Sequence, residues 1–288
     1  MKYRLTATIA AVAALGLGLS ACATSGTTNP TTSTSTTSAT STDSATSTDS
    51  TTASAAADLQ LVTPGALTVC SDLPYPPFEM EDPTSASGYS GFDIDLISAI
   101  ADGLGLKVIV LPTDFNALQS GVALAANQCD IGASAMTITD DRKANLDFAD
   151  PYYDSLQSLM VRTDSGIKTL ADMGGKKIGV QTGTTGEMYT NANKPTTAQT
   201  VSFPSDGEMW LAMQAGQVDA LLQDYPVNLT HTKADSTYMI AEKYNTDEQY
   251  GFAMSKGKNP ALLAAVNAQL KTLRDNGTYQ QIYDKYFS

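Results

Sequence analysis

The chain has 288 residues, of which 30 are acidic and 17 basic, so its formal net charge is −13 and its pI is near 4.3. This surplus of negative charge argues against nucleic acid or an anionic membrane surface as a partner. The chain has a single histidine, His231, and no Cys/His cluster, which argues against a zinc site or a histidine-based triad. We therefore expect neither a metal nor a cofactor.

The N-terminal residues have the pattern of a processing signal. Two basic residues precede an apolar run over 9–19, which is too short to span a bilayer, and Leu-Ser-Ala then leads to Cys22. This ending resembles a lipobox, in which the cysteine is lipidated and becomes the mature N-terminus. Cleavage as a plain signal peptide is the alternative. We expect a signal peptide over 1–21 and a protein anchored by lipid on the outer face of the cell membrane.

Residues 22–57 are expected to form a lipid-anchored linker. From residue 23 the segment is almost entirely Ser, Thr and Ala, with no aromatic residue and no Lys or Arg. Such a composition cannot bury enough apolar surface to offset its ordering entropy, so it predicts a disordered spacer. Folded sequence is expected from Asp58 onward. The roughly 230 residues that remain are enough for one large domain or two lobes.

From Leu67 onward, short apolar runs alternate with amphipathic helices, a pattern typical of an α/β architecture. The strands expected in a first set lie at 67–70, 107–111 and 130–134. Helices of this set are expected to begin at Asp93 and to cover 116–126. The second set comprises an apolar segment at 170–173, a strand at 177–180, a helix at 207–215 and a strand at 218–222.

Apolar runs at 156–162 and 250–255 bracket the second set, and we expect both to cross between two lobes as a two-segment hinge. Closing helices over 260–274 and 278–286 are expected to return to the first lobe. The predicted organisation is a two-lobed α/β fold, each lobe a mostly parallel sheet flanked by helices, with a cleft at the strands' carboxyl ends. Lobe 1 comprises 58–160 and 257–288, and lobe 2 comprises 161–256.

An arginine stands at an unusual place after the strand at 130–134. Thr139 is a good N-cap, and two aspartates follow it, so Arg142 falls near the third helical position, where a capping box carries Glu or Gln. A cation there is unfavourable by roughly 0.3–1 kcal/mol, a cost that the aspartates offset. Arg142 is therefore either a solvated surface residue or, with Thr137, a binding site for an external carboxylate.

Two further segments point to a charged ligand. The Gly/Thr-rich turn that begins at Gln181 opens a helix and offers N–H groups and hydroxyls to an anion, with a structural cap that binds no ligand as the alternative. It lacks the lysine of a phosphate-binding loop, which argues against a nucleotide. Asp224 follows the strand at 220–223 and can hold an ammonium, or it can cap the next helix. Together with Arg142, these segments describe a site for the zwitterion of an α-amino acid.

The remaining candidates are two aromatic residues and two cysteines. Tyr75 lies in a proline-rich loop and can stack on a ligand side chain, with Phe115 opposite, although isolated aromatic residues more often belong to the core. Once Cys22 is assigned to the lipid, Cys70 and Cys129 remain as an even pair in an oxidising compartment. A disulfide and two buried free thiols are both open.

Motifs along the whole folded part resemble one known family, the bacterial extracellular solute-binding proteins of the polar amino acid type, which are binding components of ABC importers. The matching segments, in family order, are 72–79 (DLPYPPFE), 91–96 (GFDIDL), 134–142, 148–153 (FADPYY), 179–185 (GVQTGTT) and 270–279. The resemblance implies a type II periplasmic-binding-protein fold. It also implies a monomer, not an enzyme, that captures a free polar L-amino acid, with a basic or amide side chain favoured, and delivers it to a membrane permease.

The resemblance also implies roles for single residues. Arg142 would grip the ligand carboxylate with Thr137 and Thr185, while Asp224 and the carbonyl of Ala135 would take the ammonium. The residues expected around the ligand side chain are Asp72, Tyr75, Phe115 and Ser134. The chain departs from the family pattern at Pro74, Ala135 and Gly186, which bears on side-chain preference.

Two alternative functions remain open on the same fold. One is an enzyme resembling a cyclohexadienyl dehydratase, for which Glu79 or Asp72 could serve as the general acid. The other is a component of a ligand-sensing receptor.

Overall fold

The computed structural model describes residues 59–288. The expected signal peptide over 1–21, the lipidation site Cys22 and the linker over 22–57 lie outside the described residues. Within 59–288, no helix is both long enough and apolar enough to span a bilayer.

Lobe 1 is built on a five-stranded sheet with the order β4-β1-β5-β12-β6. Its strands are β1 (Ala66–Ser71), β4 (Lys107–Pro112), β5 (Ile131–Gly132), β6 (Leu146–Phe148) and β12 (Ala253–Ser255). β1 runs parallel to both β4 and β5, whereas β12 is antiparallel to its two neighbours. A short hairpin of β2 (Met80–Glu81) and β3 (Tyr89–Ser90) lies outside this sheet.

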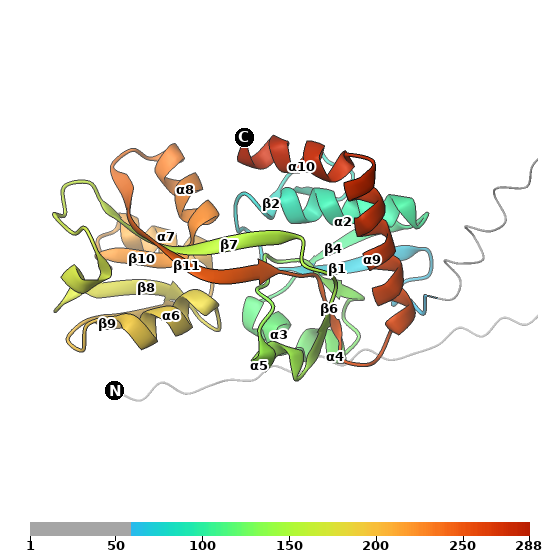
Figure 1. The fold of residues 1–288 in the computed structure, drawn as a ribbon, viewed down its shortest axis with the longest axis horizontal. Coiled ribbons are helices and arrows are strands. Elements are labelled where there is room, and N and C mark those ends of the chain that lie inside the picture. Colours follow the sequence, from blue (N-terminus) through green and yellow to red (C-terminus); the bar gives the residue numbers. More distant parts are fainter. Residues whose placement is uncertain (1–58) are drawn as a thin grey trace, which may run out of the picture. The chain divides into compact units, whose positions relative to one another are not determined.

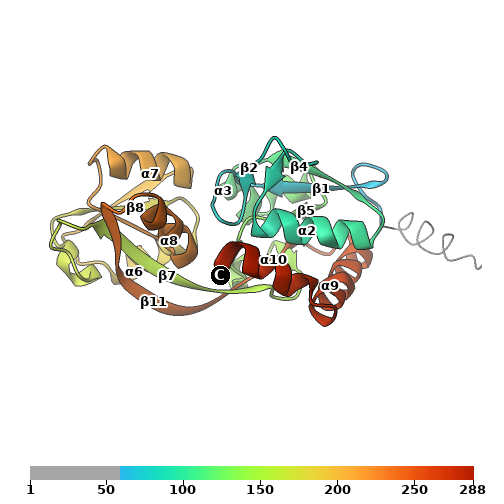
Figure 2. The same cartoon turned by 90° about the horizontal axis from the view of Figure 1, so that it is seen from above.

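The helices of lobe 1 are α2 (Phe92–Gly103), α3 (Phe115–Gln119), α4 (Val122–Ala125), α5 (Asp140–Lys143), α9 (Pro260–Asp275) and α10 (Thr278–Phe287). α2 packs against both α9 and α10 (Figure 2). Its buried residues Leu96, Ile97 and Ile100 recur at helical spacing and join Leu67 and Val69 of β1 in the main core. Each such side chain stabilises the fold by roughly 1.5–3 kcal/mol relative to its exposure in the unfolded chain.

Lobe 2 is built on a second five-stranded sheet with the order β11-β7-β10-β8-β9. Its strands are β7 (Tyr153–Arg162), β8 (Lys177–Gln181), β9 (Gln199–Phe203), β10 (Ala220–Asp224) and β11 (Tyr238–Tyr250), and its helices are η1 (Leu170–Met173, 3-10), α6 (Thr185–Asn193), α7 (Asp206–Gln214) and α8 (Tyr225–Ala234). β8, β9 and β10 are parallel, while β7 is antiparallel to β10 and β11. The expected two-lobed α/β fold with mostly parallel sheets is confirmed (Figure 1).

The two long strands β7 and β11 run side by side from one lobe to the other (Figure 1). Tyr153 and Tyr250 stand at the lobe 1 ends of these strands, and their rings stack 5.4 Å apart within the main core. The sheet membership places the lobe boundaries differently from the ranges 58–160, 161–256 and 257–288. β7 pairs along its length within the second sheet, and β12 pairs only with strands of the first, so the crossings lie near Tyr153 and Tyr250.

Two local expectations differ from the structure. The helix expected over 116–126 is split into α3 and α4, because Gly121 adopts a left-handed conformation with φ 80°. Asp93 does not cap α2, whose N-cap is Gly91 with φ 129°. A Cβ atom at Gly91 would collide with the backbone carbonyl of Phe78, so glycine permits the close approach of α2 to the Tyr75–Phe78 loop.

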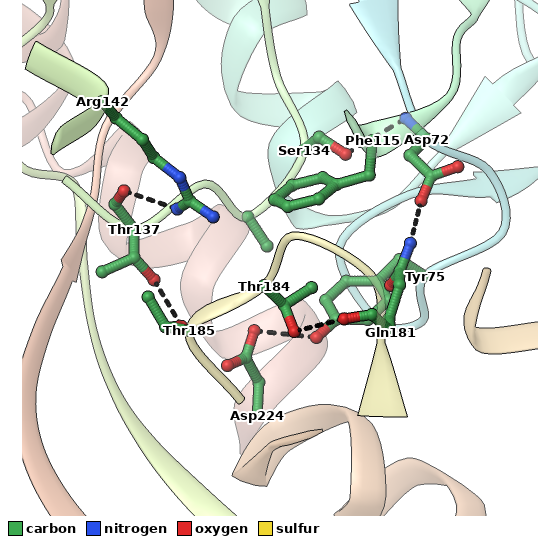
Figure 3. Close-up of a pocket in the computed structure, with 11 residues that line it drawn as sticks. Asp72, Tyr75, Phe115, Ser134, Thr137, Arg142, Gln181, Thr184, Thr185 and Asp224 are labelled. Carbon is green, nitrogen blue, oxygen red and sulfur yellow. Dashed lines mark hydrogen bonds between the residues drawn. The ribbon is translucent and has the colours of Figure 1, made fainter. Parts of the chain in front are cut away.

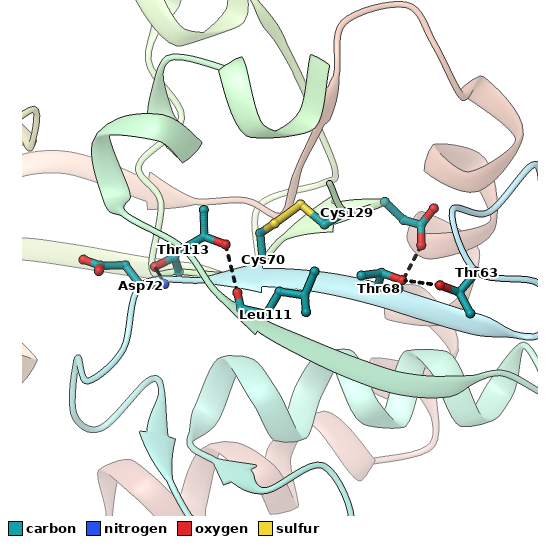
Figure 4. The surroundings of a disulfide bond; sticks show 9 residues. Thr63, Thr68, Cys70, Asp72, Leu111, Thr113 and Cys129 are labelled. Atoms are coloured by element: carbon teal, nitrogen blue, oxygen red, sulfur yellow. Dashed lines mark hydrogen bonds between the residues drawn. A yellow bond between two sulfur atoms is a disulfide. The ribbon is translucent and has the colours of Figure 1, made fainter. Parts of the chain in front are cut away.

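A disulfide joins Cys70 of β1 to Cys129, just before β5 (Figure 4). The two cysteines are 59 positions apart in the sequence, and both are buried in a cluster that includes Phe115 and Leu118. The bond therefore ties β1 to the segment that leads into β5, the central strand of the lobe 1 sheet.

Replacing both Cys70 and Cys129 with Ser should lower the free energy of unfolding by about 4 kcal/mol, because the unfolded chain regains the entropy of a long open loop. Denaturant unfolding of the double variant and of the oxidised parent measures the difference. Equal free energies of unfolding for the two proteins would contradict a stabilising role for this bond.

Candidate functional site

Arg142 is a buried cation between the two lobes. Thr139 caps α5 by accepting from the Arg142 N–H at 3.2 Å, which fixes the arginine in the first turn. Its side chain is only 3% exposed, so its interpretation as a solvated surface residue is wrong. The guanidinium donates to the carbonyl of Thr137 at 2.7 Å and, across the cleft, to that of Gly183 at 3.0 Å, while the Phe115 ring lies 5.2 Å away.

The charge of Arg142 has no direct counter-ion among the described residues. No carboxylate there forms a salt bridge with it, and its buried Nε atom has no hydrogen-bond partner. Burial lowers the pKa of Arg142 to about 10, while the more distant charges of Asp224 and Glu248 act in the opposite direction. The arginine is thus protonated at neutral pH and retains an unused donor.

The Gly/Thr turn of lobe 2 faces Arg142 from the other side of the cleft. Thr184 caps α6 by accepting from the Glu187 N–H at 3.1 Å, and Thr185 begins the helix. The Thr185 hydroxyl lies 3.4 Å from that of Thr137 in lobe 1 (Figure 3). Gly186 lets α6 approach β10, since a Cβ atom there would stand 3.0 Å from the Leu222 carbonyl. Two hydroxyls from opposite lobes therefore meet beside the arginine.

Asp224 ends β10 and carries the second charge of the cleft. Although it occupies the N-cap position of α8, its side chain makes no capping hydrogen bond, so the alternative role as a helix cap is wrong. One carboxylate oxygen accepts from the Tyr75 hydroxyl of lobe 1 at 2.8 Å, and the other accepts from Gln157 at 2.5 Å. Burial, with the nearby charge of Glu248, raises the pKa of Asp224 to about 7.

A further hydrogen bond between the lobes joins Asp72 of lobe 1 and Gln181 of lobe 2. Asp72 accepts from the Gln181 amide of lobe 2 at 2.6 Å, and the Asp72 N–H donates to the hydroxyl of Ser134 at 3.1 Å. Burial raises the pKa of Asp72 to about 7, although the Gln181 hydrogen bond opposes this rise. This part of the cleft can therefore offer a carboxylate and an amide to a polar ligand group.

Two residues that line the pocket, Ser134 and Ala135, form hydrogen bonds with buried carboxyl groups. Ser134 donates to Glu79 at 2.8 Å, and the Ala135 N–H donates to Asp93 at 2.8 Å. Ala135 has a φ of 42°, an uncommon conformation for a residue with a Cβ atom, and the bond to Asp93 helps to hold it. Glu79 and Asp93 are fully buried, and their hydrogen bonds hold Ser134 and Ala135 in position.

All nine residues predicted to contact the ligand surround one interlobe pocket (Figure 3). Its lining consists of Asp72, Tyr75, Phe115, Ser134, Ala135, Thr137, Arg142, Gln181, Thr184, Thr185 and Asp224. Free space in this closed pocket is about 10 Å³, roughly what a single water needs. An amino acid can therefore enter only when the lobes separate or the side chains move.

The sequence-based prediction did not include four polar residues of this network. Gln181 and Thr184 line the pocket, and Gln157 and Glu248 stand behind it. Gln181 and Thr184 lie in the Gly/Thr turn that pointed to the site. Gln157 is a polar residue inside the apolar run over 156–162. A buried polar side chain is expected to have a hydrogen-bond partner, and this expectation could have identified Gln157. Nothing in the sequence around Glu248 marks it.

Comparisons with known proteins agree with this architecture. A family model for bacterial extracellular solute-binding proteins, family 3, matches residues 67–288. The glutamine-binding protein GlnH of an ABC transporter in Bacillus subtilis is 34% identical over 217 residues, which cover 73% of this chain and 76% of that protein.

Solved structures give the same result. An ancestral arginine-binding protein bound to arginine has a TM-score of 0.71 at 37% identity, covering 78% of this chain and 99% of that one. The ancestral amino acid-binding protein AncCDT-1, a precursor of cyclohexadienyl dehydratase, has a TM-score of 0.70 at 37% identity, covering 78% and 96%. These matches confirm the family expected from the motifs: the chain belongs to the bacterial extracellular solute-binding proteins, family 3.

Proposed function

We propose that this protein captures a free polar L-amino acid between its two lobes, as the binding component of an ABC importer. The observation that carries this proposal is the buried charge of Arg142, which forms no salt bridge within the described residues and keeps a free Nε donor. A ligand carboxylate can accept from this guanidinium and from the hydroxyls of Thr137 and Thr185.

The other end of the zwitterion fits Asp224. Its carboxylate faces the same pocket from lobe 2, and it accepts there from Tyr75 of lobe 1. An incoming ammonium brings the positive charge that the buried carboxylate lacks, and the pocket-lining Ala135 is the proposed source of a carbonyl acceptor. Because Arg142 and Asp224 belong to different lobes, a ligand that contacts both favours the closed state over the open one.

The ligand side chain is proposed to carry a basic or amide group. Asp72 and Gln181 together offer a carboxylate and an amide, while Tyr75 and Phe115 supply aromatic surface and Ser134 a hydroxyl. Similarity to a glutamine-binding protein and to an arginine-binding protein bound to arginine supports this choice.

We propose capture of the ligand and not its chemical conversion, although AncCDT-1 is related to an enzyme. Glu79, one candidate for a general acid, is fully buried and does not line the pocket. Both oxygens of Asp224 accept hydrogen bonds, which suits a group that holds an ammonium. Delivery to a membrane permease, a monomeric state and anchoring through a lipid on Cys22 complete the proposal.

Replacement of Arg142 with Met should weaken amino acid binding by roughly 3–5 kcal/mol, because the ligand carboxylate loses its charged partner while still being buried. The ligand is first found by a thermal-shift screen of the twenty amino acids, in which an excess of about a hundred times the Kd adds about 2.7 kcal/mol. Titration calorimetry then measures the loss of affinity.

Arg162 provides the matched control, because it is an exposed arginine that pairs with Asp164. The variant Arg162→Met should bind the amino acid as the parent does. Full affinity in the Arg142→Met variant would contradict the proposed role, and a screen with no stabilising amino acid would contradict the function itself.

Amino acid affinity should fall as the pH is lowered through about 7, because the pKa of unliganded Asp224 is raised to about 7 and only its carboxylate attracts the ammonium. The free energy of unfolding of the protein without ligand should change with pH in the opposite direction to the affinity. A pKa raised from 3.8 contributes stability that is complete below the unfolded value and is lost as the pH rises through about 7.

Thermal unfolding between about pH 5 and about pH 8 measures both effects, with and without ligand. Without ligand, the parent should lose stability with rising pH, and Asp224→Asn should reduce that loss. The ligand-induced increase in Tm should grow over the same range in the parent. An identical pH dependence in the parent and the variant would show that Asp224 does not titrate there.

A further inference from the structure

Glu248 is a buried carboxylate behind the pocket that the proposed function does not use. It lies near the end of β11, is only 7% exposed, and forms no salt bridge within the part of the chain that the structure describes. The pairing of β11 with β7 shifts register between Tyr244 and Glu248. Such an irregularity redirects side chains, and here it accompanies a carboxylate turned into the interlobe network.

The partners of Glu248 are the hydroxyls that a ligand carboxylate would need. Its Oε2 atom accepts from Thr137 of lobe 1 at 2.7 Å and from Thr185 of lobe 2 at 2.7 Å. Gln157 donates to Glu248 at 3.2 Å and, at 2.5 Å, to Asp224. One carboxylate oxygen thus joins the two lobes where the proposed function places the ligand carboxylate.

A hydroxyl has one proton, so it can donate one strong hydrogen bond at a time. When Thr137 and Thr185 donate to Glu248, only their lone pairs are left for an incoming carboxylate. A ligand must therefore redirect both hydroxyls away from Glu248, and it must also place a second negative charge near this buried one.

We propose that Glu248 is a positioning residue: it holds the hydroxyls of Thr137 and Thr185 from the two sides of the cleft and lowers ligand affinity by competing with the ligand carboxylate for them. This inference rests on the proposed function. It assigns to Glu248 the setting of affinity, a role separate from the charge recognition assigned to Arg142 and Asp224.

The test compares Glu248→Gln with the parent. The amide keeps the shape and one oxygen acceptor but removes the charge, so the hydroxyls are released more easily. Because hydrogen bonds to charged groups are stronger than neutral ones, amino acid affinity should rise about tenfold. Asp247→Asn is the matched control, since it removes the same charge from the exposed neighbouring residue and should leave the affinity unchanged.

The probes are L-arginine and agmatine, which is arginine without its carboxylate. If another amino acid stabilises the protein more in the screen of twenty, that amino acid and its decarboxylated amine replace them. Calorimetry should show tighter binding of the amino acid to Glu248→Gln but no gain for the amine, because the amine does not compete for the two hydroxyls. Glu248→Met, which fills a similar volume without accepting hydrogen bonds, should give the same result and serves if the glutamine variant fails to fold.

Each other outcome is decisive. Weaker binding of both probes would show that Glu248 holds the ammonium. An equal change or no change for both would show a structural role only. Either result overturns this inference while leaving the proposed function intact. If neither the parent nor the Glu248 variants bind any amino acid, the proposed function fails and this inference fails with it.

Discussion

The burial of one positive charge governs the arrangement of the cleft. Removing a guanidinium from water costs several kcal/mol unless other groups replace its hydration. Two backbone carbonyls replace part of it for Arg142, that of Thr137 in lobe 1 and that of Gly183 in lobe 2. Carbonyls supply hydrogen bonds but no opposite charge. A small anion can supply the opposite charge, and because Arg142 contacts both lobes, its binding favours their approach.

The polar groups that face the cleft form hydrogen bonds with one another, and a ligand has to replace these bonds. Tyr75 binds Asp224, Gln181 binds Asp72, and Glu248 takes the hydroxyls of two threonines. Each bond joins the lobes or supports a group that does. A ligand shifts the equilibrium between open and closed states only by its differential affinity for them. Its contacts must therefore improve on these internal ones, so a residue such as Glu248 can tune affinity without defining which ligand is chosen.

Much of this site could be predicted from the sequence because its main elements are local. Thr139, the two following aspartates and Arg142 form a helix start that the structure reproduces, with the arginine where a capping box would carry Glu or Gln. The Gly/Thr turn after β8 and the position of Asp224 at the end of β10 were equally visible. The family resemblance completed the set of nine expected residues, and in the structure all nine line one pocket.

The features that could not be predicted from the sequence depend on contacts between segments that are distant in the chain. β11 was not expected because register shifts interrupt its alternation of buried and exposed residues, so Glu248 carried no recognisable pattern. The lobe boundaries were misplaced for a related reason. The apolar run containing β7 shows that a strand forms, but only its pairing with β10 and β11 shows that it belongs to the second sheet. Pairing partners of this kind are not encoded in any single strand.

The central claim is that the two ends of an amino acid are held by opposite lobes. A crystal structure of the protein grown with its tightest-binding amino acid tests this most directly. The account predicts a ligand carboxylate about 3 Å from the Arg142 guanidinium and a ligand ammonium about 3 Å from the Asp224 carboxylate, with the lobes closed around both. A ligand bound in the reverse orientation, or bound outside this pocket, would contradict it.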